Sequence, residues 1–148
     1  MAFGRRANNV ATLPRAYRQL ETLMDRRLQE RSDLTLTDYV ILVNLSEAPD
    51  RKIRMNELAD ITVVSRSRMT YRIDSLVRRG YIDRVICDDD RRGLYASLTD
   101  EGFTKLAEAA PDHVEDVRSV LFDQIMPDEY PAFSAAIIRI ATGMRELG

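Results

Sequence analysis

The chain has 148 residues, of which 45% are hydrophobic and 31% charged, a balance that indicates a folded domain and excludes a largely disordered chain. Lysine and arginine number 22 against 24 aspartates and glutamates, so the formal net charge is −2. The chain therefore lacks the overall basic charge that many nucleic-acid binders carry, and an anionic partner has to be met by a local basic surface.

Cysteine usage and hydropathy indicate the compartment. The single cysteine, Cys87, excludes an intramolecular disulfide framework and favours a reducing environment. No apolar run reaches the roughly 18 residues of a membrane-spanning helix, and residues 1–6 lack the apolar core of a signal peptide. We therefore expect a cytoplasmic protein without a membrane partner.

The first predicted element is a helix over residues 9–31. Leu13, Tyr17 and Leu20 begin an apolar stripe in which hydrophobic residues recur at spacings of three and four. A stripe of this kind indicates a helix that buries one face against another element or another chain.

A second helix is predicted over residues 36–47, with Thr35 or Thr37 placed to cap its start. It is apolar on most sides, which is typical of a central, buried helix. Residues 51–55 are expected to be short and extended, and residues 56–61 to form a compact helix before the next turn.

The helix predicted over residues 66–79 carries the most informative pattern in the chain. Ser65 precedes it as a good N-cap, and Gly80 follows it as a left-handed stop. Its apolar residues fall on one face and so direct outward a set of arginines and hydroxyl-bearing side chains, namely Arg66, Ser67, Thr70 and Tyr71, together with Asp74, and with Arg68 and Arg72 at the flanks.

This outward face has the chemistry of a DNA-reading surface. Arginine offers a planar donor fork for guanine edges or phosphates, while serine, threonine and tyrosine hydroxyls reach phosphates or bases. The helix start also presents unpaired N–H groups to a phosphate. A solvated, arginine-rich surface helix shows the same pattern, so the helix alone leaves both interpretations open.

A β-hairpin is predicted next, with its strands at residues 81–87 and 94–98. Arg91 and Arg92 fall at its tip, where they can reach a narrow minor groove whose negative potential attracts arginine. Asp90 lies two residues before Arg92 and can pair with it. A basic hairpin behind a groove-sized helix is more specific than either feature alone, although an aspartate-rich turn is also common in solvated hairpins.

Two further helices are predicted at residues 100–124 and 129–147. The last helix carries an apolar face formed by Phe133, Ile137, Ile140 and Met144. This face and the stripe of Leu13, Tyr17 and Leu20 exceed what a small winged core needs, so we expect them to form a homodimer interface. A monomeric helical bundle is the alternative.

The order of these elements predicts the fold class. It is mainly α with a small β-hairpin wing, a winged helix-turn-helix of six helices in one chain, residues 1–148. Residues 36–99 are the predicted DNA-binding lobe. Residues 9–31 and 100–147 are the predicted dimerisation helices.

Three stretches carry a family resemblance. Residues 90–102 read Asp-Arg-Arg-Gly-Leu-Tyr-Ala-Ser-Leu-Thr-Asp-Glu-Gly, while residues 56–59 and 76–82 read Asn-Glu-Leu-Ala and Leu-Val-Arg-Arg-Gly-Tyr-Ile. The first resembles the wing signature of the MarR family of multiple-antibiotic-resistance type regulators, Asp-x-Arg followed by Leu-Thr-x-x-Gly. The other two resemble the helix-turn-helix core of that family and the exit of its recognition helix.

The resemblance implies roles for individual residues. Arg92 would be the wing arginine that enters the minor groove, with Asp90 as the partner that holds it. The recognition-helix positions would be residues 65–72, in a homodimer that sets two such helices about one DNA turn apart. Members of the family often sense a small aromatic ligand in the crevice between the dimer arm and the DNA-binding lobe.

Catalytic and metal chemistry find little support in the residue types. His113 is the one histidine, and its acidic neighbours do not have the spacing of a metal-ligand set, so we expect an exposed histidine on an acidic helix. The chain shows no phosphate-binding glycine loop and no nucleophile–histidine grouping. We therefore expect no enzyme, no cofactor and no metal.

The sequence predicts a homodimeric regulator of transcription that binds double-stranded DNA. We expect a repressor on a palindromic operator, released in one version of the mechanism by a small aromatic effector. The alternative is a winged-helix protein–protein adaptor without DNA binding, supported by the net negative charge and the aspartate-rich turn. The arginines of the recognition helix and the wing favour the regulator, because an adaptor does not need them on one face.

Overall fold

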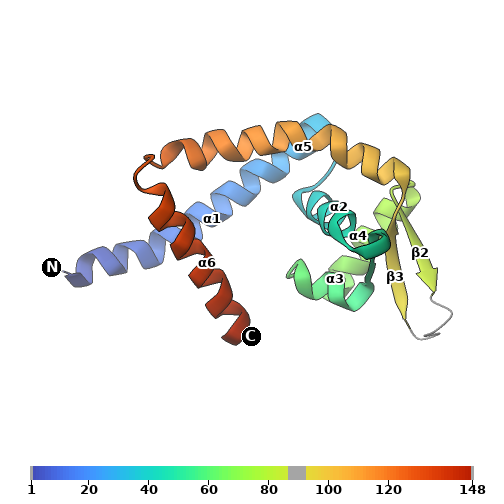
Figure 1. Ribbon diagram of the computed structural model, residues 1–148, viewed down its shortest axis with the longest axis horizontal. Helices are drawn as coiled ribbons and strands as arrows, with labels where there is room; N and C mark the ends of the chain where they lie inside the picture. Colours follow the sequence, from blue (N-terminus) through green and yellow to red (C-terminus); the bar gives the residue numbers. More distant parts are fainter. Residues whose placement is uncertain (1, 87–92, 148) are drawn as a thin grey trace. The chain divides into compact units, whose positions relative to one another are not determined.

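The computed structural model describes residues 2–86 and 93–147, which divide into two units, one up to His113 and one from Val114 (Figure 1). In these ranges the elements are α1 (Ala2–Ser32), α2 (Leu36–Glu47), the 3₁₀ turn η1 (Pro49–Arg51), β1 (Lys52–Arg54), α3 (Met55–Ile61), α4 (Arg66–Arg78), β2 (Ile82–Ile86), β3 (Leu94–Leu98), α5 (Asp100–Val120), η2 (Phe122–Gln124) and α6 (Tyr130–Leu147). The six helices and the small antiparallel sheet confirm the predicted winged helix-turn-helix class.

The core of the first unit is centred on α2, as its all-round apolar pattern predicts. Ile41, Leu42 and Leu45 of α2 are fully buried in one cluster with Ile73 and Leu76 of α4. Burying an aliphatic side chain of this size contributes about 1.5–3 kcal/mol relative to leaving it exposed. The apolar face of α4 is therefore held inward, and its opposite face is left to solvent.

A capping box fixes the start of α2. The Thr35 hydroxyl accepts a hydrogen bond from the backbone N–H of Asp38 at 3.0 Å, and the Asp38 carboxylate accepts one from the backbone N–H of Thr35 at 3.1 Å. Asp25 of α1 adds a third contact, because its carboxylate accepts from the backbone N–H of Leu36 at 2.8 Å. The cap thus joins α1 and α2 and confirms Thr35, of the two predicted candidates, as the N-cap.

The same carboxylate reaches the recognition helix. Asp38 Oδ2 lies 3.6 Å from Arg72 Nη1, and the two side chains are 3% and 24% exposed. Asp38 Oδ1 and Arg72 Nε are buried without a hydrogen-bond partner in the described residues. An ion pair buried to this degree is costly to break from one side, because the remaining charge is left without its partner.

The sheet has three strands in the order β1–β3–β2, all antiparallel. The hairpin pairs Ile82 with Leu98 and Ile86 with Leu94, as the alternating segments predict. The extended segment after η1 pairs as well, with Ile53 opposite Ala96. This third strand links the segment before α3 to the hairpin, so the helices and the wing are joined through one sheet.

The exit of α4 packs against the start of α5 at the Leu-Thr-x-x-Gly signature. Gly80 has a φ of 76°, the predicted left-handed stop, and its carbonyl accepts from the Thr99 hydroxyl at 2.7 Å. Thr99 also caps α5, since its Oγ1 accepts from the backbone N–H of Gly102 at 2.9 Å. A Cβ at Gly102 would lie 2.1 Å from the Tyr81 carbonyl oxygen, so only glycine fits there.

The turn before α4 holds a strained residue. Val63 has a φ of 54°, in the left-handed region that β-branched residues rarely adopt, and it is 91% exposed. Backbone hydrogen bonds hold this conformation, from Val63 N–H to the Asp60 carbonyl and from Val64 N–H to the Ala59 carbonyl, at 3.3 and 3.1 Å. The turn therefore aims Ser65 at the solvent and begins α4 there.

Two of the predicted helix boundaries need correction. The first helix begins at Ala2 rather than residue 9, since extending a nucleated helix costs little even where no apolar stripe guides it. The fifth helix ends at Val120, and the predicted last turn is the separate 3₁₀ segment η2. There the Arg118 guanidinium bonds Asp123 at 3.2 Å, which draws the chain back towards the helix end.

The prediction of an exposed His113 is wrong as well. Its ring lies half-buried, 4.3 Å from the Tyr39 ring between centroids. Leu106 and Ala109 are buried on the same face of α5, and His113 follows Ala109 by four residues. The helix therefore continues its inward face through His113, and burial raises the pKa of the Tyr39 phenol that meets it.

The second unit consists of the rest of α5, η2 and α6. Arg118 donates to Glu115 at 2.9 Å, a bond that lowers the pKa of this exposed carboxyl. The Phe122 and Tyr130 rings meet across the turn, with 6.1 Å between centroids. In the described part of the chain no helix is both long and apolar enough to cross a bilayer.

We expect the Gly102→Ala substitution to destabilise the fold, because its methyl group has to displace the Tyr81 backbone rather than a movable side chain. Overpacking of this kind costs about 3 kcal/mol or more, which lowers Tm by roughly 6–12 °C in a chain of this length. Thermal unfolding followed by circular dichroism measures the change. Gly143→Ala in α6 is the matched control, since nothing lies within 4 Å of its Cβ position; it should leave Tm unchanged or slightly raised. An unchanged Tm for Gly102→Ala would contradict the close approach.

We expect Asp38→Ala to lower the free energy of unfolding by about 3 kcal/mol, because it strands the Arg72 guanidinium and removes the α2 capping box. Urea denaturation gives this free energy directly. Asp33→Asn is the control, since Asp33 also pairs with an arginine, Arg79 directly after α4, at 3.1 Å, but its side chain is 94% exposed. That pair is worth less than about 1 kcal/mol. Equal effects of the two substitutions would show that burial does not strengthen the Asp38 contact.

Candidate nucleic-acid interface

Six of the seven residues predicted for the recognition helix lie on one exposed surface at the start of α4. They are Ser65, Arg66, Ser67, Arg68, Thr70 and Tyr71. The buried residues of this helix, Met69, Ile73 and Leu76, recur at spacings of four and three and hold the opposite face in the core. The exposed surface is therefore fixed mainly by the packing behind it.

Local hydrogen bonds contribute to the order at the start of this surface. Ser65 Oγ accepts from the Arg68 backbone N–H at 3.4 Å, as expected of an N-cap, and lies 3.4 Å from the Ser67 hydroxyl. The Thr70 hydroxyl donates back to the Arg66 carbonyl at 3.0 Å. These contacts leave the arginine side chains extended into solvent, where a donor fork can meet a phosphate or a guanine edge.

Arg72 is placed differently from the other six. Its side chain turns towards α2 and pairs with Asp38, and its guanidinium carbon lies 5.7 Å from the centre of the Tyr71 ring. The spacing of apolar residues puts Arg72 at the flank of the helix. A side chain at the flank can point either to solvent or towards a neighbouring helix. Its partner lies 34 positions earlier in the chain, and no local pattern indicates such a pairing.

The three predicted wing residues, Asp90, Arg91 and Arg92, lie outside the described residues, as does Cys87. The strands that lead to them are described: β2 and β3 pair in register up to Ile86 and Leu94. The hairpin that would carry the wing is thus confirmed, and the roles of the residues at its tip stay a prediction.

Arg84 of β2 is a basic residue of this region that the sequence interpretation did not select. Its Nη2 lies 2.5 Å from Asp74 Oδ1, so the hairpin and α4 are joined by an ion pair. Asp74 was expected to face outward, and it is half-buried in this contact. The ten-residue separation crosses a turn, which is why helical spacing could not reveal the pair.

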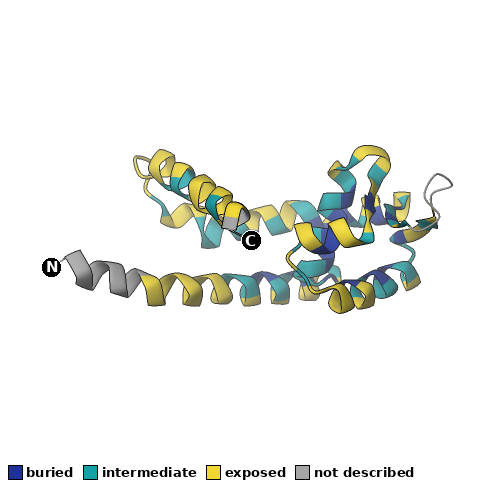
Figure 2. Cartoon of the chain, turned by 90° about the horizontal axis from the view of Figure 1, so that it is seen from below, coloured by how far each residue is buried: buried dark blue, intermediate teal, exposed yellow. Residues whose placement is uncertain are grey.

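The apolar residues predicted for a dimer interface are largely exposed within one chain. On α1, Leu13 and Tyr17 are 61% and 58% exposed and Leu20 is half-buried. Exposed residues predominate along the first described turns of this helix (Figure 2). The Tyr17 hydroxyl donates to Glu21 at 2.7 Å, which raises the pKa of Tyr17. Exposed hydrophobic side chains at regular helical spacing are costly in water unless a partner covers them.

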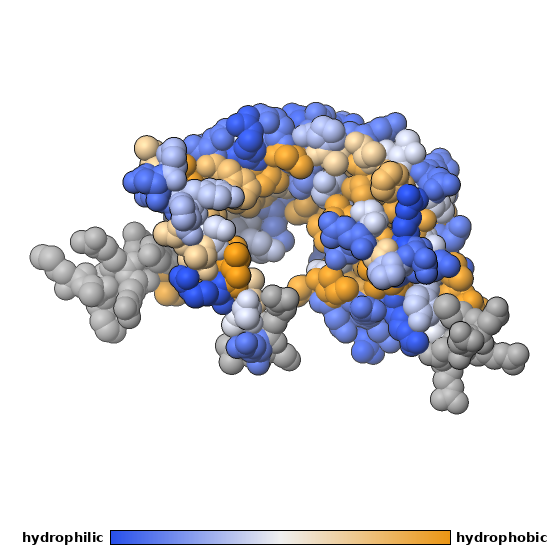
Figure 3. Space-filling view, in the orientation of Figure 1, coloured by the Kyte–Doolittle hydropathy of each residue, from blue (hydrophilic) through white to orange (hydrophobic). Residues whose placement is uncertain are grey.

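The last helix shows the same feature. Ile137, Ile140 and Met144 are exposed and Phe133 is half-buried, so hydrophobic side chains reach the surface of α6 (Figure 3). Each unit of the chain therefore carries its own uncovered apolar helix face.

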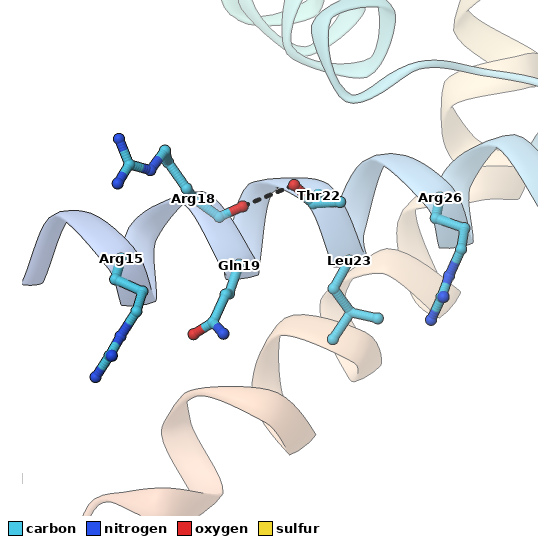
Figure 4. A pocket seen from close by; sticks show the side chains of 6 residues that line it. All are labelled: Arg15, Arg18, Gln19, Thr22, Leu23 and Arg26. Atoms are coloured by element: carbon cyan, nitrogen blue, oxygen red, sulfur yellow. Dashed lines mark hydrogen bonds between the residues drawn. The ribbon is translucent and has the colours of Figure 1, made fainter. Parts of the chain in front are cut away.

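A shallow hollow along α1 is lined by Arg15, Arg18, Gln19, Thr22, Leu23 and Arg26 (Figure 4). The Thr22 hydroxyl donates to the Arg18 carbonyl at 2.8 Å, within the helix. Three arginines make this stretch positively charged, unlike the apolar, enclosed sites that bind small ligands. Nor do three or more histidine, cysteine, aspartate or glutamate side chains meet as a metal-ion site anywhere in the described ranges.

Known proteins share this geometry. The profile described as the MarR family matches residues 32–93. Sco3205 of Streptomyces coelicolor, a MarR family transcriptional regulator crystallised in complex with DNA, is 34% identical, with a TM-score of 0.87 over 95% of this chain and 88% of its own. AbsC, a MarR family transcriptional regulator from the same organism, is also 34% identical, with a TM-score of 0.85 over 95% of this chain and 94% of its own.

A curated relative gives a partial match. The HTH-type transcriptional regulator PecS of Dickeya dadantii is 30% identical over 108 residues, which are 70% of this chain and 64%, less than two thirds, of PecS. The family profile and the two crystal structures are of the MarR family, and PecS is likewise a transcriptional regulator. The exposed surface of α4 and the described strands of the wing agree with these relatives. The chain therefore belongs to the MarR family of winged-helix transcriptional regulators.

Proposed function

We propose that the chain is a homodimeric, sequence-specific DNA-binding regulator that represses transcription from a palindromic operator. The observation that carries the proposal is the exposed surface of α4, on which Ser65, Arg66, Ser67, Arg68, Thr70 and Tyr71 lie together over a buried apolar base. Sco3205, with 34% identity over nearly the whole chain, was crystallised with DNA. A DNA-binding regulator fits both facts, and an enzyme fits neither.

The residues of this surface divide by the chemistry they offer. Arg66 and Arg68 extend from the first turn of α4 and can contact guanine O6 and N7 with two parallel hydrogen bonds. Ser65 and Ser67 lie at the helix start, where hydroxyls and backbone N–H groups suit a phosphate. Thr70 and Tyr71 lie one turn further, within reach of base edges or sugars in the major groove.

Arg72 has a positioning role in this proposal. Its contact with Asp38 joins α4 to the capped start of α2, so the pair sets the direction in which the recognition helix points. The contact also makes Arg72 less available to DNA than Arg68. We therefore assign DNA contact to the six exposed residues and orientation of the helix to Arg72.

The wing completes the proposed interface. In this proposal Arg92, with Asp90 as its partner, enters the minor groove next to the major groove read by α4, and Arg91 adds a second positive charge for that groove. The support is the confirmed β2–β3 hairpin together with the Asp-x-Arg signature in the sequence.

Dimerisation is proposed through the apolar faces of α1 and α6. These two faces, on Leu13, Tyr17 and Leu20 and on Phe133, Ile137, Ile140 and Met144, gain hydrophobic stabilisation when a second copy covers them. A two-fold axis then sets two recognition helices about 34 Å apart, the spacing of successive major grooves on one side of DNA. The operator is accordingly a palindrome. The regulator acts in the cytoplasm, where its DNA lies.

Release by a small aromatic effector is the remaining part of the proposal. Its support is the family resemblance, in which the crevice beside the dimer arm often takes such a ligand. The ligand acts by favouring a dimer conformation whose recognition helices no longer match successive grooves. A screen of phenolic acids for loss of DNA binding tests it.

The adaptor alternative makes a different prediction about salt. Selection from a random duplex pool, followed by fluorescence anisotropy at several salt concentrations, separates the two functions. A DNA-binding regulator enriches a palindrome and loses affinity steeply as salt rises. An adaptor enriches no sequence, and that result would overturn the proposed function.

We expect Arg68→Ala to weaken binding to the selected operator by tenfold or more, since one bidentate base contact is worth about 1–3 kcal/mol. Anisotropy titration measures the affinity, and circular dichroism checks that the fold is unchanged. Arg26→Ala on α1 is the matched control, because Arg26 is an exposed helix arginine whose Nε lies 3.9 Å from Glu30 Oε1, outside the proposed DNA-binding surface. The assignment fails if both variants bind like the wild type.

We expect Ile137→Asp to convert the dimer to a 17.0 kDa monomer, because it places a charge in the apolar face of α6. Light scattering coupled to size-exclusion chromatography gives the mass. Val63→Asp is the control, since Val63 is the more exposed apolar residue but lies outside the proposed interface. A monomeric wild type, or a dimer that survives Ile137→Asp, would place the interface elsewhere.

A further inference from the structure

Two hydrophobic side chains lie exposed at the last described position of the wing hairpin. Ile86 of β2 and Leu94 of β3 are directly opposite each other, and they are 66% and 40% exposed. Residues that oppose each other in an antiparallel pair have their side chains on the same face of the sheet. Ile86 and Leu94 therefore form one exposed apolar patch, which we call the apolar pair.

The face of the hairpin that carries the apolar pair is the face that packs on the core. Side chains alternate between the two faces of a strand, so Ile82 shares a face with Ile86. Leu98 is opposite Ile82 and shares this face with Leu94. Ile82 is fully buried and Leu98 is 5% exposed. The apolar pair thus continues the core-facing side of the hairpin beyond the edge of the core.

Two observations show that this face is turned towards the recognition helix. Arg84, two residues before Ile86 on the same face, has its Nη2 at 2.5 Å from Asp74 Oδ1 of α4. Arg84 and Leu94 also line a hollow of about 290 Å³ together with Thr70, one of the six exposed residues assigned to DNA contact. Leu94 and its opposite residue Ile86 therefore lie beside the proposed DNA-binding surface, between it and the wing tip.

A duplex bound by α4 and the wing brings its backbone to this place. In the proposed complex α4 reads the major groove and the wing tip enters the adjacent minor groove, and one strand of sugars and phosphates separates the two grooves. The hairpin has to cross that strand between its base and its tip. Ile86 and Leu94 have no donor or charge to offer a phosphate, but they match the C–H faces of the deoxyribose rings.

We propose that Ile86 and Leu94 bind deoxyribose rings of the backbone strand between the two grooves, by packing on their C–H faces. The contact removes apolar surface of both partners from water, which stabilises the complex. Hydrophobic side chains on DNA-binding elements meet duplex DNA in this way at the minor groove. This inference rests on the proposed DNA-binding function and adds an uncharged contact to an interface otherwise assigned to arginines and hydroxyls.

An apolar contact with sugars differs from a phosphate contact in its response to salt. The double variant Ile86→Thr/Leu94→Thr removes apolar surface, changes no charge and keeps residues that suit a strand. We expect it to bind operator and unrelated duplex about tenfold more weakly. The slope of log K against log salt should stay the same, because no cation that neutralises a phosphate is lost. The heat capacity change of binding should become less negative, since less apolar surface is buried.

Hydroxyl-radical footprinting gives the direct test, because the radical abstracts hydrogen from deoxyribose and so reports which sugars are covered. The full-length wild-type protein should protect sugars in each half-site between the segment read by α4 and the segment contacted by the wing tip. The double variant, at a concentration that saturates the operator, should leave these sugars open to cleavage and keep the protection elsewhere.

Two further variants keep the test decisive. Val114→Thr on α5 is the matched control, since Val114 is 61% exposed and lies outside the proposed DNA-binding surface. It should bind and protect like the wild type. The double variant Ile86→Val/Leu94→Met keeps both side chains apolar and should bind at most about threefold more weakly than the wild type. Circular dichroism checks that each variant is folded before it is titrated.

The outcomes separate this inference from the function on which it rests. If the wild type selects no duplex, the proposed function itself fails. If the wild type binds an operator and Ile86→Thr/Leu94→Thr keeps its affinity and its sugar protection, the sugar contact is wrong and the function stands. A loss of affinity with a smaller salt slope would show that the pair only supports the wing arginines. A change from dimer to monomer in light scattering would show that a second copy covers the pair, and either result overturns the inference.

Discussion

The described lobe depends on one buried carboxylate, that of Asp38. It accepts from the Thr35 backbone in the α2 cap and lies 3.6 Å from the Arg72 guanidinium of α4. Asp25 brings α1 to the same point through the backbone of Leu36. Three helices therefore meet at the capped start of α2, and the Asp38–Arg72 pair links α4 to that point.

In the proposed interface, the side chains that hold α4 in place differ from those assigned to DNA. Buried apolar residues and Arg72 fix α4 from behind, while the residues that face outward make only local contacts with the helix start. Substitutions of the outward residues are therefore expected to have little effect on stability, except at Ser65, which also caps the helix.

The sequence was sufficient for features with a local cause. A cap at Thr35 or Thr37, the buried face of α4 and the β2–β3 pairing all follow from residues a few positions apart. The structure confirms the last two and identifies Thr35 as the cap. Contacts between distant segments were not predictable. Arg72 meets Asp38, Arg84 meets Asp74 across a turn, and His113 meets Tyr39, because each pairing depends on tertiary packing that local spacing does not encode.

The junction at Gly102 has a mechanical consequence. With the Tyr81 carbonyl occupying the space of a side chain, and Thr99 bonded to both Gly80 and the first turn of α5, these segments have no freedom to slide past one another. The start of α5 and the end of α4 form a rigid joint rather than a hinge. A torque applied to the first turns of α5 is thus passed to the recognition helix as a tilt of its axis, with little lost to bending at the joint.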